Sequence, residues 1–260
     1  IRSTDGGLTF STPEPVTVGD WNTRETAIWG GARDAYVVWA DDREGNWNIF
    51  FRRWGEVQAE QEVKLSPYPI CHSPAVGGAE PNIYVVWQCV DKDSVYADVY
   101  FASSANYGVT WSGAERLTSG EAESVLPKVI VSDGAAWSFW QDGRNGEWQI
   151  LFQMMGTRIQ PPEPAIQALT DTDKPNILVD VVSTPGQIHA FWTHLEADTR
   201  AHIEYMRRDT IAPKRPGTPY HSDLTAVSGY DDDRQITFSW QASKSEGVVK
   251  YDVYSRTGDA

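Results

Sequence analysis

The sequence predicts an all-β fold, specifically a β-propeller built from four-stranded antiparallel blades, and three observations predict it. First, a β-like run ends in a tryptophan four times, with separations of 48, 53 and 52 residues, at Trp39, Trp87, Trp140 and Trp192. Second, three further β-like runs recur at matching distances, so every repeat carries four short strands. Third, the 12 tryptophans, 11 tyrosines, 21 glycines and 15 prolines are typical of short strands joined by turns.

Each strand of the repeat has its own place in the pattern. The first strands are expected to line the axis of the propeller, near residues 24–30, 71–77, 124–131 and 174–182. The second strands end in the repeated tryptophan, at 35–39, 83–87, 136–140 and 188–192. The third strands follow a loop, at 48–51, 98–101, 149–152 and 202–205. The fourth runs end at Val18, Leu65, Leu117 and Leu169. A β-sandwich with chance spacing is the alternative, which this fourfold recurrence disfavours.

The two ends of the repeat array differ from its middle. Residues 1–18 are expected to form the tail of a third strand, a turn and a fourth strand. This fourth strand either closes the last repeat into a four-bladed ring or belongs to a larger ring from which the array is truncated. We favour the larger ring, because 1–3 and 202–205 both resemble third strands and would be redundant in a closed ring of four. We therefore divide the chain into a propeller at 1–210, a Pro-rich linker at 211–219 and a second β-domain at 220–260.

Two octapeptides and the tail carry family resemblances. The segment STDGGLTF at 3–10 resembles the Asp box (BNR repeat) of sialidase-like propellers, and SANYGVTW at 104–111 resembles a second copy with asparagine at the aspartate position. The resemblance implies a structural turn between third and fourth strands, on the face opposite the catalytic centre. Its residues are Ser3, Asp5, Gly7 and Phe10, and Ser104, Asn106, Gly108 and Trp111. Runs at 224–227, 236–240 and 249–254 resemble the opening strands of a fibronectin type III domain, which is only partly present.

Composition excludes several functional classes. The chain has 22 basic and 36 acidic residues, a formal net charge of −14, and no basic run longer than Arg207-Arg208. Phosphate-rich partners need clustered cations, so nucleic acid is not an expected partner. No apolar run approaches the roughly 20 residues of a membrane helix, so membrane insertion is not expected.

One loop motif, W-x-D-x-R-x-G-x-W-x-I, occurs at 39–49 and again 101 residues later at 140–150. The favoured interpretation is a fixed loop in which the Asp and Arg side chains pair. The alternative makes the second tryptophans stacking platforms for a sugar, with the polar residues bonding its hydroxyls. The candidate ligand-binding residues are Trp21, Arg24, Asp41, Arg43, Trp47, Asp142, Arg144 and Trp148.

The chain lacks the signature of sialidase chemistry. The resemblance implies an Arg-Ile/Leu-Pro motif and a Tyr–Glu pair, but 158–161 reads RIQP and no loop supplies a clear pair. No catalytic residue is therefore predicted. The five histidines show no metal-ligand spacing, and Asp231–Asp233 is interpreted as a solvated turn rather than a calcium site, so no metal or cofactor is expected.

The only cysteines, Cys71 and Cys89, are predicted to form a disulfide. A hairpin turning near residue 80 places them opposite each other and also pairs Val76 with Tyr84. A disulfide is typical of oxidising compartments. Together these features favour a non-catalytic, secreted or cell-surface module for adhesion or for recognition of a glycan or protein. The alternatives are a sialidase-like exo-glycoside hydrolase and a structural surface or filament component; the oligomeric state is left open.

Overall fold

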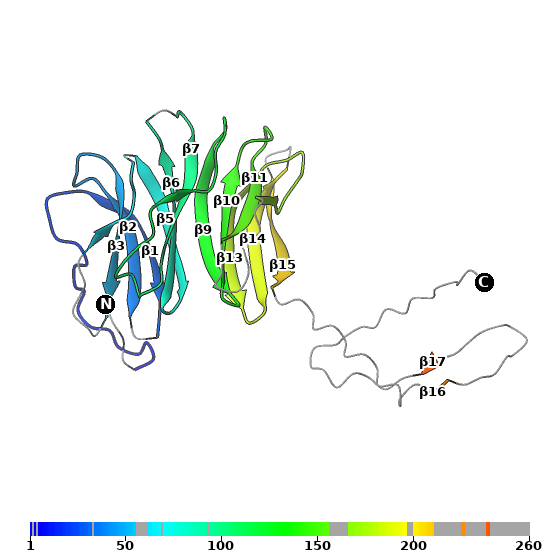
Figure 1. Cartoon of the computed structure of the whole chain (residues 1–260), viewed down its shortest axis with the longest axis horizontal. Coiled ribbons are helices and arrows are strands. Elements are labelled where there is room, and N and C mark those ends of the chain that lie inside the picture. Colours follow the sequence, from blue (N-terminus) through cyan, green and yellow to red (C-terminus); the bar gives the residue numbers. More distant parts are fainter. Residues whose placement is uncertain are drawn as a thin grey trace, which may run out of the picture. The chain divides into compact units, whose positions relative to one another are not determined.

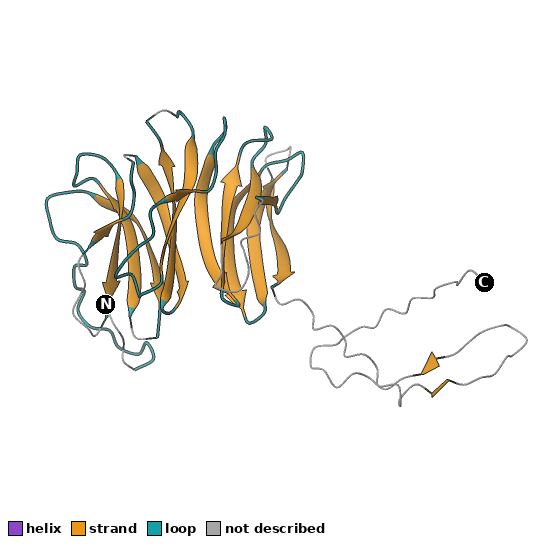
Figure 2. Cartoon of the chain, viewed as in Figure 1, coloured by secondary structure: helices purple, strands orange, loops and turns teal. Residues whose placement is uncertain are grey.

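The computed structural model describes residues 1, 3, 5–32, 34–55, 62–68, 70–92, 94–155, 166–196, 200–210, 225–226 and 238–239. The chain divides into two compact units, Ile1–Arg208 and Asp209–Ala260. Every regular element of the described residues is a β-strand (Figure 2). None of them forms a helix long and apolar enough to cross a membrane.

The first unit consists of antiparallel sheets that follow one another along the chain. Three sheets have four strands, in the orders β1-β2-β3-β4, β5-β6-β7-β8 and β9-β10-β11-β12, and the fourth, β13-β14-β15, has three among the described residues. The sheets lie side by side as an arc of blades (Figure 1). The predicted β-propeller fold class is confirmed.

The strand bounds follow the predicted repeat closely. The first strands of the blades are β1 (Thr23–Gly30), β5 (Cys71–Ala79), β9 (Ser124–Ser132) and β13 (Asn176–Thr184). The second strands are β2 (Ala35–Asp41), β6 (Asn82–Val90), β10 (Ala135–Asp142) and β14 (Gln187–Leu195). The third strands are β3 (Asn48–Trp54), β7 (Ala97–Ser104), β11 (Gln149–Met155) and β15 (Ala201–Asp209). The short fourth strands are β4 (Val63–Lys64), β8 (Glu115–Arg116) and β12 (Gln167–Ala168).

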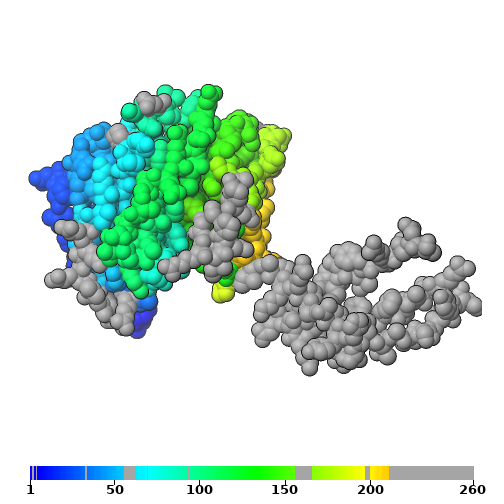
Figure 3. Space-filling view, viewed as in Figure 1, coloured from blue at the N-terminus to red at the C-terminus, as the bar shows by residue number. Residues whose placement is uncertain are grey.

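The core lies between neighbouring blades. The first strands of successive blades, β1, β5, β9 and β13, pack against one another and are therefore the inner strands. The apolar residues of β2, β5, β6 and β7 form one shared cluster, in which Tyr36 and Trp87 are fully buried. Figure 3 shows that side chains fill the space between neighbouring blades on the viewed face. Hydrophobic burial between sheets thus holds the arc together.

A bulge recurs in all four inner strands, and the sequence analysis did not predict it. The register shifts once in each inner strand, opposite the repeated tryptophan of the second strand. The bulged residue has a positive φ although it is not glycine, at Glu25 (55°), Ser73 (51°), Leu126 (52°) and Leu178 (56°). Such backbone is uncommon for side-chain-bearing residues, and it persists here because surrounding contacts hold it.

The preceding blade supplies those contacts. The Ser73 N–H donates to Glu25 Oε2 at 2.7 Å. In the next two blades, the Leu126 N–H donates to Gln88 Oε1 at 2.7 Å and the Leu178 N–H to Gln141 Oε1 at 2.6 Å. The bulges at Ser73, Leu126 and Leu178 therefore each present a backbone donor to the preceding blade and tie adjacent blades together.

The amino-terminal segment differs from the expectation. None of the described residues in 1–18 lies in a strand, so the predicted fourth strand is wrong for this structure. Val16 instead packs against β2 and β3, and its carbonyl accepts a hydrogen bond from the Arg52 guanidinium. In the first blade, β4 already occupies the position of the fourth strand beside β3.

The two octapeptides at 3–10 and 104–111 form matching turns. The Gly7 N–H donates to Ser3 Oγ at 2.8 Å, and the Gly108 N–H donates to Ser104 Oγ at 2.9 Å. The N–H groups of Thr9 and Thr110 donate to the side chains of Asp5 and Asn106, at 3.0 and 2.9 Å. The polar side chains thus satisfy the turn's own backbone donors.

In the second unit, β16 (Thr225–Ala226) pairs antiparallel with β17 (Phe238–Ser239). The fibronectin-like identity and the domain bounds stay predictions. The linker at 211–219 and the acidic run at Asp231–Asp233 lie outside the described residues.

Candidate functional site

The loops between second and third strands gather at the end of the blades where the inner strands begin. The Cys71 N–H donates to the Trp47 carbonyl at 2.9 Å, and the Asn176 N–H donates to the Trp148 carbonyl at 2.7 Å. The two tryptophans therefore occupy equivalent positions, each beside the start of the next inner strand. The Asn106 turn lies at the other end, because the Tyr107 N–H donates to the carbonyl of Pro81 in the β5–β6 turn.

The Asp and Arg residues of the repeated motif hold its loop in place. Asp41 is fully buried, accepts the Trp39 indole N–H at 2.8 Å and pairs with Arg43 at 2.5 Å. Asp142 does the same with Trp140 at 3.0 Å and Arg144 at 2.6 Å. Burial raises the pKa of Asp142, but hydrogen bonds from Arg144, Trp140 and Ser124 outweigh this effect, and the pKa lies below the ordinary value. In both loops the Asp and Arg side chains pair, as the favoured interpretation expected.

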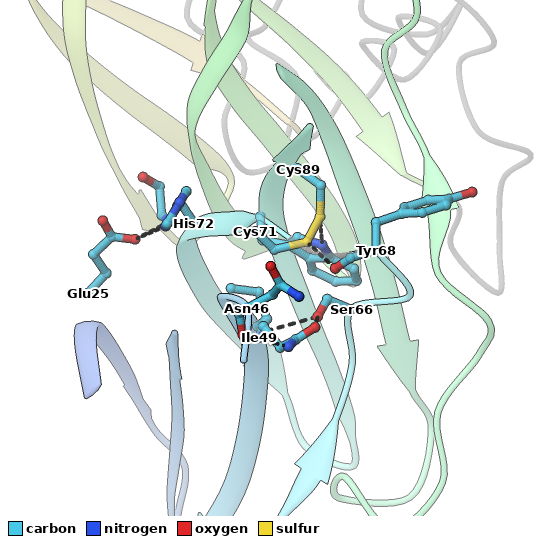
Figure 4. The surroundings of a disulfide bond; sticks show 11 residues. Glu25, Asn46, Ile49, Ser66, Tyr68, Cys71, His72 and Cys89 are labelled. Atoms are coloured by element: carbon cyan, nitrogen blue, oxygen red, sulfur yellow. Dashed lines mark hydrogen bonds and ion pairs between the residues drawn. A yellow bond between two sulfur atoms is a disulfide. The ribbon is translucent and has the colours of Figure 1, made fainter. Parts of the chain in front are cut away.

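The corresponding position differs chemically from blade to blade. It joins the first residue of the inner strand to the residue two places after the repeated tryptophan: Thr23 with Asp41, Cys71 with Cys89, Ser124 with Asp142, and Asn176 with His194. We call it the tie position. Cys71 and Cys89 are joined by a disulfide with an S–S distance of 1.97 Å (Figure 4), and Cys89 Sγ also accepts the Trp87 indole N–H at 3.0 Å.

Next to the tie positions of the first two blades, three polar residues of the inner strands gather around a loop tryptophan. They are Arg24 and Glu25 of β1, His72 of β5 and Trp47 of the β2–β3 loop, and we call them the mouth cluster. The Arg24 guanidinium lies 3.7 Å from the centre of the Trp47 ring and donates to His72 Nδ1 at 2.9 Å. Glu25 Oε2 lies 3.5 Å from the same nitrogen, and Figure 4 shows the two side chains facing each other from separate strands. The cluster thus combines an aromatic ring, a cation, a carboxylate and an imidazole.

Electrostatics keep the imidazole of this cluster neutral. Burial is the largest influence on His72 and lowers its pKa; the Glu25 carboxylate raises it and Arg24 lowers it, with a net shift below 6.5. Nearby, Asp42 accepts the Asn22 side-chain amide at 2.7 Å and the Asn22 N–H at 2.8 Å. These bonds lower the pKa of Asp42, so it stays ionised. At neutral pH a neutral imidazole, His72, therefore lies near the ionised carboxylate of Asp42.

The structure places the remaining predicted ligand residues in different roles. Trp21 and Trp47 each have an arginine over the ring, Arg43 at 4.3 Å and Arg24 at 3.7 Å, so one aromatic face is already covered in both. Trp148 is half-buried. Asp142 and Arg144 line a hollow of about 80 Å³ with Ser119, Gly120, Ala122 and Ser124. That volume is small beside the roughly 300–1,000 Å³ of typical ligand pockets, so this hollow does not hold a sugar chain by itself.

Glu25, His72 and Asp42 were missed by sequence reasoning. A signal was available in the aligned repeats. The second and third residues of the inner strands are polar in the first two blades, Arg24-Glu25 and His72-Ser73, but apolar in the next two, Val125-Leu126 and Ile177-Leu178. Leu126 and Leu178 are 37% and 60% exposed, so the mouth has a polar half and an apolar half.

No protein-family model matches the sequence, and no curated protein matches it. Solved structures do match, and several glycoside hydrolases are among them. The α-L-arabinanase of Penicillium chrysogenum has 12% identity and a TM-score of 0.52, over 72% of this chain and 62% of that chain. A family 117 glycoside hydrolase from Zobellia galactanivorans has 9% identity and a TM-score of 0.50, over 72% of this chain and 66% of that one.

A GH93 α-L-arabinofuranosidase of Fusarium graminearum, solved with arabinobiose, has 10% identity and a TM-score of 0.50, over 72% of this chain and 62% of that one. The chain thus spans 62–66% of the length of these structures. The expectation of a non-catalytic binding module is corrected by this finding, because these three structures with the same fold are glycoside hydrolases. At such low identity the likeness establishes the fold, a β-propeller of the architecture found in glycoside hydrolases.

Proposed function

We propose that this chain belongs to a β-propeller glycoside hydrolase whose substrate-binding mouth includes Arg24, Glu25, Asp42, Trp47 and His72. The observation that carries the proposal is the mouth cluster itself. Two blades bring an aromatic ring, a guanidinium, a carboxylate and a neutral imidazole to the accessible start of the inner strands. Sugar sites combine apolar surface with a few convergent polar groups, and this mouth combines both.

Two carboxylates offer the acid–base pair that glycoside hydrolysis generally uses. Asp42 stays ionised because Asn22 donates to both of its oxygens, and it suits the base or nucleophile. Glu25 lies beside the neutral His72, and we assign to Glu25 the exchange of a proton with the leaving-group oxygen. The matched arabinanase and arabinofuranosidase structures support a hydrolase of this class.

The substrate we propose is a neutral glycan. Arg24 is shared between the Trp47 ring, His72 and Glu25, whose carboxylate lies 3.8 Å from Arg24 Nε. Its charge is therefore already compensated, which disfavours an acidic sugar such as a sialoside. The exposed Leu126 and Leu178 side chains supply apolar surface for the faces of the sugar rings.

Two finer assignments go with this proposal. The matching hydrogen bonds at 3–10 and 104–111 support their assignment as Asp-box turns of the sialidase-like type. The Cys71–Cys89 disulfide supports secretion or display at a cell surface.

The test is hydrolysis of a panel of p-nitrophenyl glycosides and oligosaccharides that contains arabinosides, xylosides and a sialoside. We expect cleavage of a neutral member and none of the sialoside. Glu25→Gln and Asp42→Asn should each lower kcat by about 10²-fold or more, the loss expected when an acid or base is removed. Glu44→Gln is the matched control, because Glu44 lies in the same loop as Asp42 but pairs with Lys64.

The same panel is followed by tryptophan fluorescence to detect binding without turnover. The proposal fails if no member is cleaved and none changes the fluorescence. It also fails if the Glu25 and Asp42 variants cleave as fast as the Glu44 control.

A further inference from the structure

The tie position of the fourth blade has a polar environment of its own. In the first three blades, the repeated tryptophan donates its indole N–H to the residue two places further on, namely Asp41, Cys89 or Asp142. In the fourth blade, Trp192 instead donates to Asn176 Oδ1 and Glu204 Oε2, both at 2.9 Å. The corresponding residue, His194, is therefore not an acceptor of the tryptophan's indole N–H.

His194 belongs to a compact group with Glu196 and His202, which join the end of β14 to the start of β15. Each of these three residues offers one ligand atom, and these atoms lie within 4.8 Å of one another. The two imidazole rings are 5.0 Å apart. The Glu196 N–H donates to the Arg200 carbonyl at 2.8 Å, so the residue after β14 is bonded to the residue before β15.

Each imidazole has a side-chain oxygen within hydrogen-bonding distance of one ring nitrogen. His194 Nδ1 lies 3.0 Å from Asn176 Oδ1, an arrangement that leaves Nε2 with its lone pair when Nδ1 carries the proton. His202 Nε2 lies 3.4 Å from Glu204 Oε1, while its Nδ1 faces Glu196 Oε1 at 3.7 Å. Metal-binding histidines have such acceptors on the ring nitrogen that does not bind the metal. The buried Trp192 indole N–H holds both acceptors in place.

We propose that His194, Glu196 and His202 bind a borderline divalent cation, Zn²⁺, with a water molecule as the fourth ligand. Imidazole nitrogens and one carboxylate are the ligands that Zn²⁺ accepts, whereas Ca²⁺ prefers a shell made of oxygens. Two carboxyl groups, those of Glu196 and Glu204, lie beside His202 and supply negative charge for a cation to offset. The ion would cross-link β14 to β15 at the loop end of the blade.

The site was invisible in the sequence for a geometric reason. Its two histidines stand on opposite strands of a hairpin, so their spacing depends on loop length and not on a helical repeat. The five histidines of the sequence accordingly show no fixed metal-ligand spacing.

The experiment is a calorimetric titration of the full chain, freed of metal with a chelator, with Zn²⁺. We expect saturable binding of one ion, which His194→Ala, His202→Ala and Glu196→Gln each abolish or weaken. Glu204→Leu should weaken binding by about 10–100-fold, because it removes the acceptor behind His202 together with one of the two acceptors of the Trp192 indole while leaving all three ligands in place. His189→Ala is the matched control: His189 lies on the same strand but bonds Tyr205, so its variant should bind like wild type.

Two further measurements guard against a folding artefact. Zn²⁺ should raise the Tm of the wild-type chain but not of His202→Ala, whose Tm in chelator should equal that of wild type because His202 is exposed. Co²⁺ should give the visible absorption of a tetrahedral site, and Ca²⁺ should not compete. The proposal is overturned if the wild-type chain shows no saturable Zn²⁺ binding, or if the His194→Ala/His202→Ala double variant still binds one ion with equal affinity.

Discussion

Asp142 shows how one buried carboxylate organises a loop. Its two oxygens serve the Trp140 indole, the Arg144 guanidinium and the Ser124 hydroxyl. A buried charge is stabilising only while such partners remain, and their loss leaves several polar groups without acceptors.

We predict that Asp142→Ala lowers the free energy of unfolding by roughly 3 kcal/mol, measured by urea denaturation at neutral pH. Because the folded pKa of Asp142 is depressed, its contribution is present above about pH 4 and is lost as the pH falls through the folded pKa. Glu147→Ala, in the same loop but exposed, is the control and should be nearly neutral. Equal stability of the two variants would contradict the structural role of Asp142.

His72 tests the electrostatics of the mouth cluster. We predict that its NMR titration midpoint lies below the ordinary 6.5, since burial disfavours the charged ring. Glu25→Gln removes the group that raises the pKa and should lower the midpoint further, whereas Arg24→Ala should raise it. Folding stability linked to His72 should fall as the pH drops below about 6.5, because the unfolded chain then binds the proton more tightly. A midpoint above 6.5 in wild type would refute this assignment.

At the scale of the strand, the bulge in β5 decides which residues meet. Cys71 faces Cys89 as predicted, but Val76 faces Val85 rather than Tyr84. The bulge at Ser73 shifts the register by one residue between these pairs. Without it, Cys71 would face residue 90, and the two sulfur atoms would not be opposed.

The repeat in the sequence therefore predicted the strands, their order and their bounds to within a few residues, but not this bulge. Left-handed backbone is signalled by glycine or asparagine, and here it falls on Glu25, Ser73, Leu126 and Leu178. The neighbouring blade stabilises it through Gln88 and Gln141, a tertiary contact that no local pattern contains.

The disulfide gives an element-scale prediction. Reducing the Cys71–Cys89 bond, whose sequence separation is 18, should lower the free energy of unfolding by roughly 3 kcal/mol. Cys71→Ala/Cys89→Ala should lose about 1–3 kcal/mol more, because Trp87 then lacks its sulfur acceptor. Urea denaturation with and without reductant measures both values. If the alanine variant is as stable as the reduced protein, the indole contact contributes nothing.

At the scale of the whole molecule, the two units are separable. We predict that a chain ending at residue 210 keeps the Tm of the first unit, because Ile1–Arg208 forms a compact unit with its own cores. Differential scanning calorimetry of the full and shortened chains measures this. A Tm several degrees lower in the shortened chain would show that the second unit stabilises the blades.

The candidate site escaped the sequence analysis at this larger scale. Trp47 and Arg24 were identified, but Glu25 and His72 join them only because β1 and β5 lie side by side across two blades. The repeated motif drew attention to Asp41 and Arg43, whose recurrence reflects the same structural task in two blades. The mouth cluster is therefore indicated by the positions at which the inner strands differ between blades, not by the residues that the blades share.

The tie position implies that the blades respond to different solution conditions. The same join between inner and second strands involves a disulfide in the second blade, an ionised aspartate in the third and a histidine–asparagine pair in the fourth. A reductant would loosen the second blade, whereas strong acid, by protonating Asp142, would loosen the third. The blades thus share one framework, but chemically different interactions hold their tie positions. No single change in solution conditions would disrupt all of them.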